Sequence, residues 1–235
     1  MPVLLSLETS TDVCSVAVHQ DSSLLAIAEV HMSQAHASKL ALLVKEVMAI
    51  ANVTMKDLDG IAVSAGPGSY TGLRIGTSTA KGLCYALEIP LISAGTLDVM
   101  AENMRTFAAK EALLCPMIDA RRMEVYCAMY SNEGFRVSEV EARVIDEQSF
   151  LDQLSAGRVV FGGNGSGKCR DVITHGNAVF LDGIFPSAKH LGNLAYRKLV
   201  EGDVEDLLRF EPFYLKEFKA KLPSNIIVPV ANKPA

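Results

Sequence analysis

One order of predicted elements occurs twice along the 235 residues of this chain, and this repetition constrains the fold more than any other feature. In the first half, apolar runs separated by turn residues predict three strands within residues 3–30, followed by a helix from Ser38 to about Ala51. The second half has the same order, with predicted strands at 112–118, 124–130 and 135–144 and a helix at 147–154. Each copy continues with one more strand and one more helix, so the repeated unit is βββαβα.

A repeated βββαβα unit of about 100 residues is typical of the two-lobed actin, Hsp70 and sugar-kinase (ASKHA) class of α/β folds, in which nucleotide phosphates lie between the lobes. The alternative is a single doubly wound sheet. We favour the two-lobed fold. We expect an N-terminal lobe at 1–108, which carries dimerisation helices, and a C-terminal lobe at 109–235, which ends in an extended tail.

The balance of charge limits what the chain can bind on its own. Its formal net charge is −5, so the sequence offers no broad basic face for a nucleic-acid backbone. No run reaches the ~18 apolar residues of a membrane-spanning helix, and the N-terminus does not resemble a signal peptide, so we expect a cytoplasmic protein without a membrane partner. The cysteines form no Cys-x-x-Cys pair, and we expect reduced core thiols at Cys14, Cys84, Cys115, Cys127 and Cys169.

Two turns that follow equivalent strands carry polar side chains suited to a nucleotide phosphate or its metal ion. Thr9 and Ser10 follow the first strand, where hydroxyl and backbone N–H groups could face a phosphate. The alternative is a turn that only caps the end of the strand. Asp119 follows the equivalent strand of the second half, where its carboxylate could orient a hydrated magnesium ion or pair with a neighbouring arginine.

A glycine-rich run that begins at Gly66 predicts a tight turn between a strand and a helix. Gly66 and Gly68 relieve the clash that a Cβ atom would cause, and Ser69 or Thr71 caps the following helix. The helix N-terminus could receive an anion, with Arg74 adding a positive charge. The alternative is that this turn only packs the helix closely and binds nothing.

A second glycine-rich run, at residues 161–169, comes close to a phosphate loop. Gly163, Gly165 and Lys168 lie between a predicted strand and a predicted helix, but Cys169 stands where that motif has a magnesium-binding hydroxyl. The run is therefore a glycine turn on the adenosine side of a two-lobed fold, a plain turn or, with least support, a true phosphate loop. No His-Glu-x-x-His motif or nucleophile elbow occurs, so we predict no metal site and no catalytic residue.

The helices that begin near Ser38 and Thr71 carry more apolar surface than one core needs. Such a helix is either deeply buried or covered by a partner, and we favour a partner interface. The side chains expected at this interface are Leu40, Leu43, Val44, Val47, Leu73, Gly76, Thr77, Ala80, Lys81 and Cys84.

Four motifs, in this order and spacing, resemble the TsaB (YeaZ) family over most of the chain. They are the runs Leu5–Ser10, Gly66–Gly76 and Met117–Tyr126 and the final signature Glu211–Lys216. The resemblance implies a non-catalytic scaffold in the machinery that forms the threonylcarbamoyl modification (t6A) on adenosine 37 of tRNAs that read ANN codons. It also implies pairing with the catalytic paralogue TsaD, recruitment of the ATPase TsaE, a weak homodimer, tRNA contact only through the complex, no tightly bound cofactor, and a site for ATP or ADP at the subunit boundary.

Two departures bear on the chemistry. The first strand ends in Glu8, where the wider fold and commonly this family have aspartate, and the additional methylene displaces the carboxylate by about 1.5 Å. The metal-binding histidine pair of the catalytic paralogue falls near residues 93–100, where this chain has no histidine. The competing hypothesis is an autonomous ATP-dependent phosphotransferase of the sugar-kinase class, which the duplicated plan and the glycine turns motivate.

Overall fold

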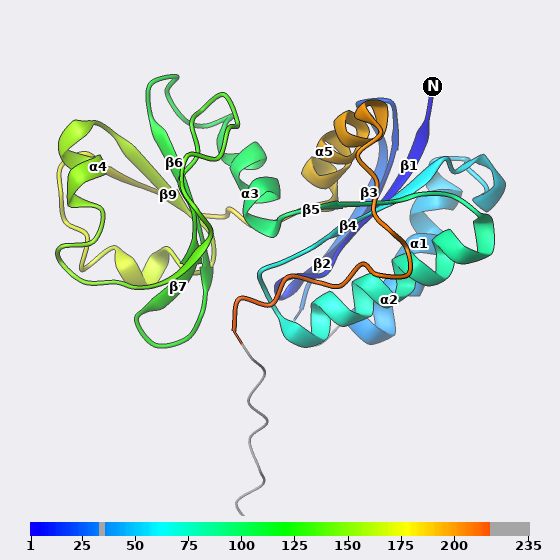
Figure 1. Ribbon diagram of the computed structural model, residues 1–235, viewed down its shortest axis with the longest axis horizontal. Coiled ribbons are helices and arrows are strands. Elements are labelled where there is room, and N and C mark those ends of the chain that lie inside the picture. The colour runs from blue at the N-terminus through cyan, green and yellow to red at the C-terminus, as the bar shows by residue number, and fades with distance from the viewer. Residues whose placement is uncertain (33–35, 217–235) are drawn as a thin grey trace, which may run out of the picture.

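The computed structural model describes residues 1–32 and 36–216, which form two lobes that each contain a five-stranded mixed sheet (Figure 1). The strand order is β3-β2-β1-β4-β5 in the first sheet and β10-β9-β6-β7-β8 in the second. In the first sheet, β1 pairs antiparallel with β2 and parallel with β4. In the second sheet, β6 likewise pairs antiparallel with β7 and parallel with β9. The predicted two-lobed α/β fold is therefore confirmed. No helix in the described part of the chain is long and apolar enough to cross a membrane.

The first lobe is built around β1, whose six residues are all buried. Because side chains alternate along a strand, Val3, Leu5 and Leu7 pack toward α1 and α2, whereas Leu4 packs toward α5 on the opposite face. The lobe contains β1 (Val3–Glu8), β2 (Val13–Gln20), β3 (Ser23–His31), α1 (His36–Ile50), the 3₁₀ turn η1 (Met55–Asp57), β4 (Gly60–Ser64), α2 (Tyr70–Leu87) and β5 (Leu91–Ala94).

The second lobe repeats this arrangement around β6. Cys115 and Met117 pack on the side of α4, whereas Leu114 and Ile118 pack on the side of α3. The lobe contains β6 (Leu113–Asp119), β7 (Glu124–Cys127), β8 (Glu141–Val144), α4 (Leu151–Ala156), β9 (Val159–Gly162), the 3₁₀ turn η2 (Gly167–Cys169) and β10 (Ala178–Leu181). All five cysteines of the chain are free and buried, as their spacing predicts.

Helices α3 and α5 change the predicted division of the chain. Helix α3 (Thr96–Met104) lies between the sheets, with Val99 in the core of the first lobe and Met100 in the core of the second. Helix α5 (Ala188–Glu201) packs on β1 and β2, so the chain returns to the first lobe after β10. The prediction that the C-terminal lobe occupies all of 109–235 is therefore wrong. The tail at 217–235 lies outside the described residues.

Several predicted elements of the second half are shorter than expected, including the strand predicted at 124–130, which ends at Cys127. Of the strand predicted at 135–144, only Glu141–Val144 forms a regular strand, whereas the part that follows the turn at Gly134 makes an isolated antiparallel bridge between Arg136 and Tyr130. The helix predicted near 168–174 is only the single 3₁₀ turn η2. Apolar composition alone could not distinguish these turns from regular elements.

Candidate functional site

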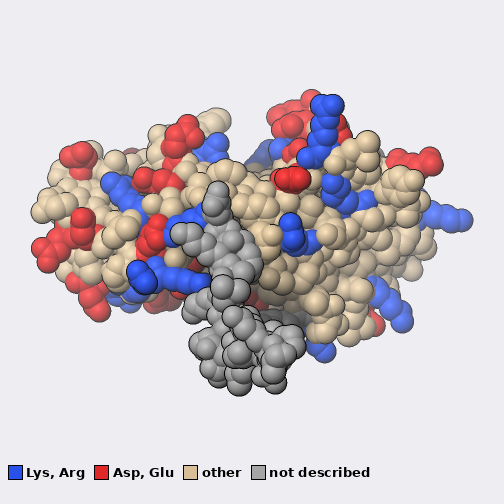
Figure 2. Space-filling view, turned by 60° about the horizontal axis from the view of Figure 1, so that its bottom comes forward, with Lys and Arg blue, Asp and Glu red and all other residues tan. Residues whose placement is uncertain are grey.

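A cleft of about 1150 Å³ lies between the two lobes at the ends of β1 and β6. Figure 2 shows a face of the molecule on which Lys and Arg side chains lie on both lobes. The cleft is lined by Ser10, Thr11, Asp12, Pro67, Gly68, Ser69, Tyr70, Thr71, Ile118, Asp119, Ala120, Arg121, Arg122, Glu124, Tyr126, Asn164, Phe213, Tyr214, Leu215 and Lys216. Its position between duplicated lobes makes it the candidate functional site.

In the first lobe, the two turns predicted to hold a phosphate are bonded to each other. The N–H of Ser69 donates to the carbonyl of Ser10 at 2.6 Å, and a Cβ atom on Gly68 would lie 2.2 Å from that same oxygen. The Thr9 hydroxyl donates to the carbonyl of Gly72 at 2.8 Å, and only 1% of Thr9 is exposed. The prediction that Thr9 faces a phosphate is therefore wrong, because its hydroxyl fastens α2 to the end of β1.

Gly66 also faces the protein rather than the cleft. Its backbone has φ = 108°, and a Cβ atom there would lie 2.5 Å from the carbonyl oxygen of Phe213. The N–H of Phe213 donates to the carbonyl of Ala65 at 2.7 Å. The glycine is required for the close approach of residue 213, and the prediction that it faces a phosphate is wrong.

Glu8 is fully buried at the end of β1 and does not reach the cleft. Its Oε1 accepts hydrogen bonds from the N–H of Ser10 at 2.7 Å and from the Ser10 hydroxyl at 2.5 Å, while Oε2 accepts one from the Ser64 hydroxyl. Burial raises the pKa of the Glu8 carboxyl above its ordinary value of 4.5, although these hydrogen bonds oppose the increase. The longer glutamate side chain thus turns inward, where it cannot orient a metal ion in the cleft.

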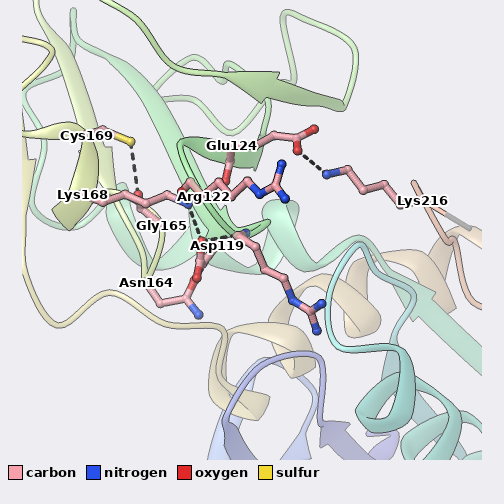
Figure 3. A network of polar contacts seen from close by, with 9 residues as sticks. Asp119, Arg122, Glu124, Asn164, Gly165, Lys168, Cys169 and Lys216 are labelled. Carbon is pink, nitrogen blue, oxygen red and sulfur yellow. Dashed lines mark hydrogen bonds and ion pairs between the residues drawn. The ribbon is translucent and has the colours of Figure 1, made fainter. Parts of the chain in front are cut away.

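In the second lobe, Lys168 holds together the turn that carries Asp119 (Figure 3). Its ammonium group pairs with the Asp119 carboxylate and donates to the carbonyl of Arg122 at 2.6 Å and of Glu124 at 2.7 Å. These three acceptors match the three protons of the ammonium group. The phosphate-loop interpretation is therefore wrong, because its lysine is a structural clamp. Asp119 lines the cleft as predicted, but its ionic partner is this lysine rather than an arginine.

Gly163 and Gly165 pack against the end of β6 instead of lining the cleft. A Cβ atom on Gly163 would lie 2.2 Å from the carbonyl oxygen of Met117, and one on Gly165 would lie 2.8 Å from the carbonyl carbon of Ile118. Both predictions of a nucleotide-facing glycine are wrong for this reason. The residue between them, Asn164, lines the cleft, and its Oδ1 accepts a hydrogen bond from the N–H of Asp119 at 3.0 Å.

Three of the seven predicted phosphate-facing residues thus meet at the cleft, namely Ser10, Gly68 and Asp119. The sequence prediction missed Arg121 and Arg122, which occupy consecutive left-handed backbone positions with φ = 73° and 50°. The available signal was a pair of arginines that follows, after Ala120, the aspartate that ends a strand. The cleft is therefore lined by two exposed arginines of the second lobe. The glycine turn of the first lobe, which was predicted to bind a phosphate, is instead bonded to Ser10.

Comparison with known proteins decides the family. The family model described as "TsaD: tRNA N6-adenosine threonylcarbamoyltransferase" matches residues 28–168. The tRNA threonylcarbamoyladenosine biosynthesis protein TsaB of Escherichia coli K12 is 32% identical over 232 residues, which cover 94% of this chain and 98% of the relative. The chain belongs to the TsaB family. The resemblance of its motifs to this family is confirmed.

Other relatives of this TsaB-family chain agree with the assignment. The Haemophilus influenzae TsaB is 28% identical over 222 residues, covering 91% of this chain and 93% of the relative. The solved structure "YeaZ from Pseudomonas aeruginosa" has a TM-score of 0.78 at 28% identity and covers 92% of this chain and 100% of that chain. An ADPNP-bound activator of 2-hydroxyisocaproyl-CoA dehydratase from Clostridium difficile has a TM-score of 0.51 at 7% identity, with 86% of this chain and 96% of that chain covered, and shows only the shared fold.

The two helices predicted to bind a partner present a different face from the one expected. Every residue of the predicted interface except Lys81 is buried in the core of this TsaB-family chain. The prediction selected the apolar stripe that packs on the sheet, so it is wrong for Leu40, Leu43, Val44, Val47, Leu73, Gly76, Thr77, Ala80 and Cys84. Lys81 is half-buried and donates to the carbonyls of Leu208 and Phe210. The exposed faces of α1 and α2 instead carry Leu42, Ile50, Gly82 and Tyr85.

Proposed function

We propose that this chain is a non-catalytic subunit in the biosynthesis of threonylcarbamoyladenosine (t6A) on tRNA. The observation that supports this function most strongly is the similarity to E. coli TsaB along almost the full length of both chains. The modified position would be adenosine 37 of tRNAs that read ANN codons. With tRNA as the substrate of the complex, the chain would act in the cytoplasm.

The cleft supports a role without catalysis. An ASKHA phosphotransferase needs a carboxylate and a phosphate-binding turn that face the cleft, whereas Glu8 is buried and the 66–69 turn is bonded to Ser10. Lys168 neutralises Asp119, which is the equivalent acid of the second lobe. The alternative of an autonomous ATP-dependent phosphotransferase therefore has no support from the site geometry.

The exposed faces of α1 and α2 are the surface that we propose for the catalytic paralogue TsaD. Leu42, Ile50 and Tyr85 are 49%, 70% and 77% exposed. A Cβ atom on Gly82 would meet no atom within 4 Å, so this glycine leaves room for the backbone of a partner helix. The same face would form a weak homodimer when TsaD is absent, and TsaE would join the assembled pair.

We propose that ATP or ADP binds at the boundary of this chain with its partner and that the isolated chain holds no nucleotide tightly. The glycine turn at residues 66–69 supports the absence of tight nucleotide binding by the isolated chain, because this turn is bonded to Ser10 and packs closely against it. The formal net charge of −5 supports tRNA binding mainly through the partner subunit.

Titration calorimetry tests these assignments with the purified chain, TsaD and ATP. The chain should bind TsaD, should give no heat with ATP alone, and should take up ATP or ADP once it is paired with TsaD. ATP turnover by the isolated chain would contradict the non-catalytic role. Failure to bind TsaD would contradict the partner assignment.

A further inference from the structure

The segment after α5, residues 204–216, runs across the first lobe toward the second, and we call it the strap (orange in Figure 1). It is fastened to the first lobe along its length. The N–H of Glu205 donates to the carbonyl of Leu91 at 2.9 Å, Lys81 donates to the carbonyl of Phe210 at 3.1 Å, and the N–H of Phe213 donates to the carbonyl of Ala65 at 2.7 Å. These anchors fix the path of the strap up to the rim of the cleft.

The end of the strap crosses the cleft and contacts the second lobe. The ring of Tyr214 still packs on Tyr70 of the first lobe, with 4.9 Å between centroids. Lys216 then forms an ion pair with Glu124 on β7 (Figure 3), and its ammonium group lies 5.7 Å from the ring centroid of Tyr126. Among residues 1–32 and 36–216, this is the one ion pair that joins the strap to the second lobe.

The lobes are also joined by the crossover from β10 to α5 and by helix α3. Toward the second lobe, Asp98 of α3 accepts a 2.7 Å hydrogen bond from the Tyr130 hydroxyl. Toward the first lobe, Val99 packs in the core with α5, and Glu102 pairs with Arg197 of α5 at 3.4 Å. Among the described residues, the lobes therefore share a packed joint at α3, and Lys216 makes the one ion pair where the strap crosses the cleft.

We propose that the strap is a latch: the contact of Lys216 with Glu124 and Tyr126 holds the lobes at their present separation, and its release lets the second lobe turn about α3 and open the cleft. This inference concerns the chain alone and does not rest on the proposed function. The ion pair is partly exposed, with side-chain exposures of 39% and 25%, and is therefore open to screening by salt. Loss of an exposed ion pair together with a cation–π contact should raise the ratio of open to closed molecules about 5- to 20-fold.

Pulsed electron paramagnetic resonance can measure the separation of the lobes directly. Spin labels are attached to Lys45→Cys on α1 and Asp152→Cys on α4, which are exposed positions in different lobes, while the five native cysteines are buried. Lys216→Met and Glu124→Gln should each add a longer and broader distance component, and raising the salt concentration should do the same in the parent. The double variant should show no increase beyond that of Lys216→Met, because this change alone removes both the ion pair and the cation–π contact.

Arg209→Met is the matched control. Arg209 also lies on the strap and forms an ion pair, but only with Asp206 of the strap itself, so its loss should leave the distances unchanged. A thermal melt of each variant separates release of the latch from unfolding. The proposal is overturned if Lys216→Met and Glu124→Gln keep the parent distance distribution, if their effects add, or if Arg209→Met changes the distribution equally.

Discussion

Gly82 belongs to the proposed docking surface on α2 and not to the core of the first lobe. It lies in the interior of α2 with its Cα facing solvent, whereas Ala80, two residues earlier, is fully buried. We predict that Gly82→Arg abolishes pairing with TsaD and leaves the fold intact. Ala80→Arg should instead unfold the first lobe, because it forces a charge into the apolar cluster that contains Leu5 and Val63.

We expect Gly82→Arg to stabilise the monomer and to weaken its complex with TsaD. Glycine in a helix interior is about 1 kcal/mol less favourable than a good helix former, so Gly82→Arg should raise the melting temperature of the monomer by roughly 2–4 °C. An unpaired charge buried in an interface costs about 3–5 kcal/mol. The affinity for TsaD should therefore fall at least about 100-fold.

Differential scanning calorimetry measures the first effect, and titration with TsaD measures the second. Gly82→Ala is the control, since it should give the same stabilisation and retain much more of the affinity. Unchanged binding of Gly82→Arg to TsaD would refute the proposed docking face. A lowered melting temperature of Gly82→Arg would refute the outward position of this residue.

Three further predictions concern contacts that support the walls of the cleft. Gly72→Ala would place a Cβ atom 2.1 Å from the carbonyl of Thr9, so it should lower stability by about 1–3 kcal/mol in urea unfolding, although alanine is the better helix former. Lys168→Met should destabilise the chain by about 1–3 kcal/mol in the same measurement without changing ATP uptake by its pair with TsaD in calorimetry, because the lysine holds a turn and no phosphate. For Glu8, the raised pKa means that its favourable contribution is present below pH 4.5 and declines as pH rises through the folded pKa, so the stability of Glu8→Gln relative to the parent should increase between pH 4.5 and 8 in urea titrations.

The architecture could be predicted because its signals are local and occur twice. The continuous apolar run at Val3–Leu7 predicts a buried central strand, and that strand lies in the middle of the first sheet. Ser69 was one of two predicted caps of the second helix, and its hydroxyl accepts the N–H of Gly72. The return of α5 to the first lobe could not be predicted, because an amphipathic helix shows which face it buries and not which of two sheets it covers.

The site could be predicted only in part, because a glycine in a turn has two physical causes that look alike in sequence. Gly163 and Gly165 allow the close approach of a neighbouring strand, which requires the same missing Cβ as the approach of a phosphate. Helix faces were confused for a related reason. Leu43 and Leu42 are both apolar, and only the position of the sheet makes the first a core residue and the second a surface residue.

We propose above all that this chain supports t6A formation without performing the transfer itself. The decisive measurement is the yield of threonylcarbamoyladenosine in tRNA digests, quantified by mass spectrometry after incubation with threonylcarbamoyl-adenylate, ATP, TsaD and TsaE. We predict product when this chain is added to TsaD and TsaE, little when it is omitted, and none when it is the single protein present. Product formed equally well in its absence, or by the chain alone, would contradict the account.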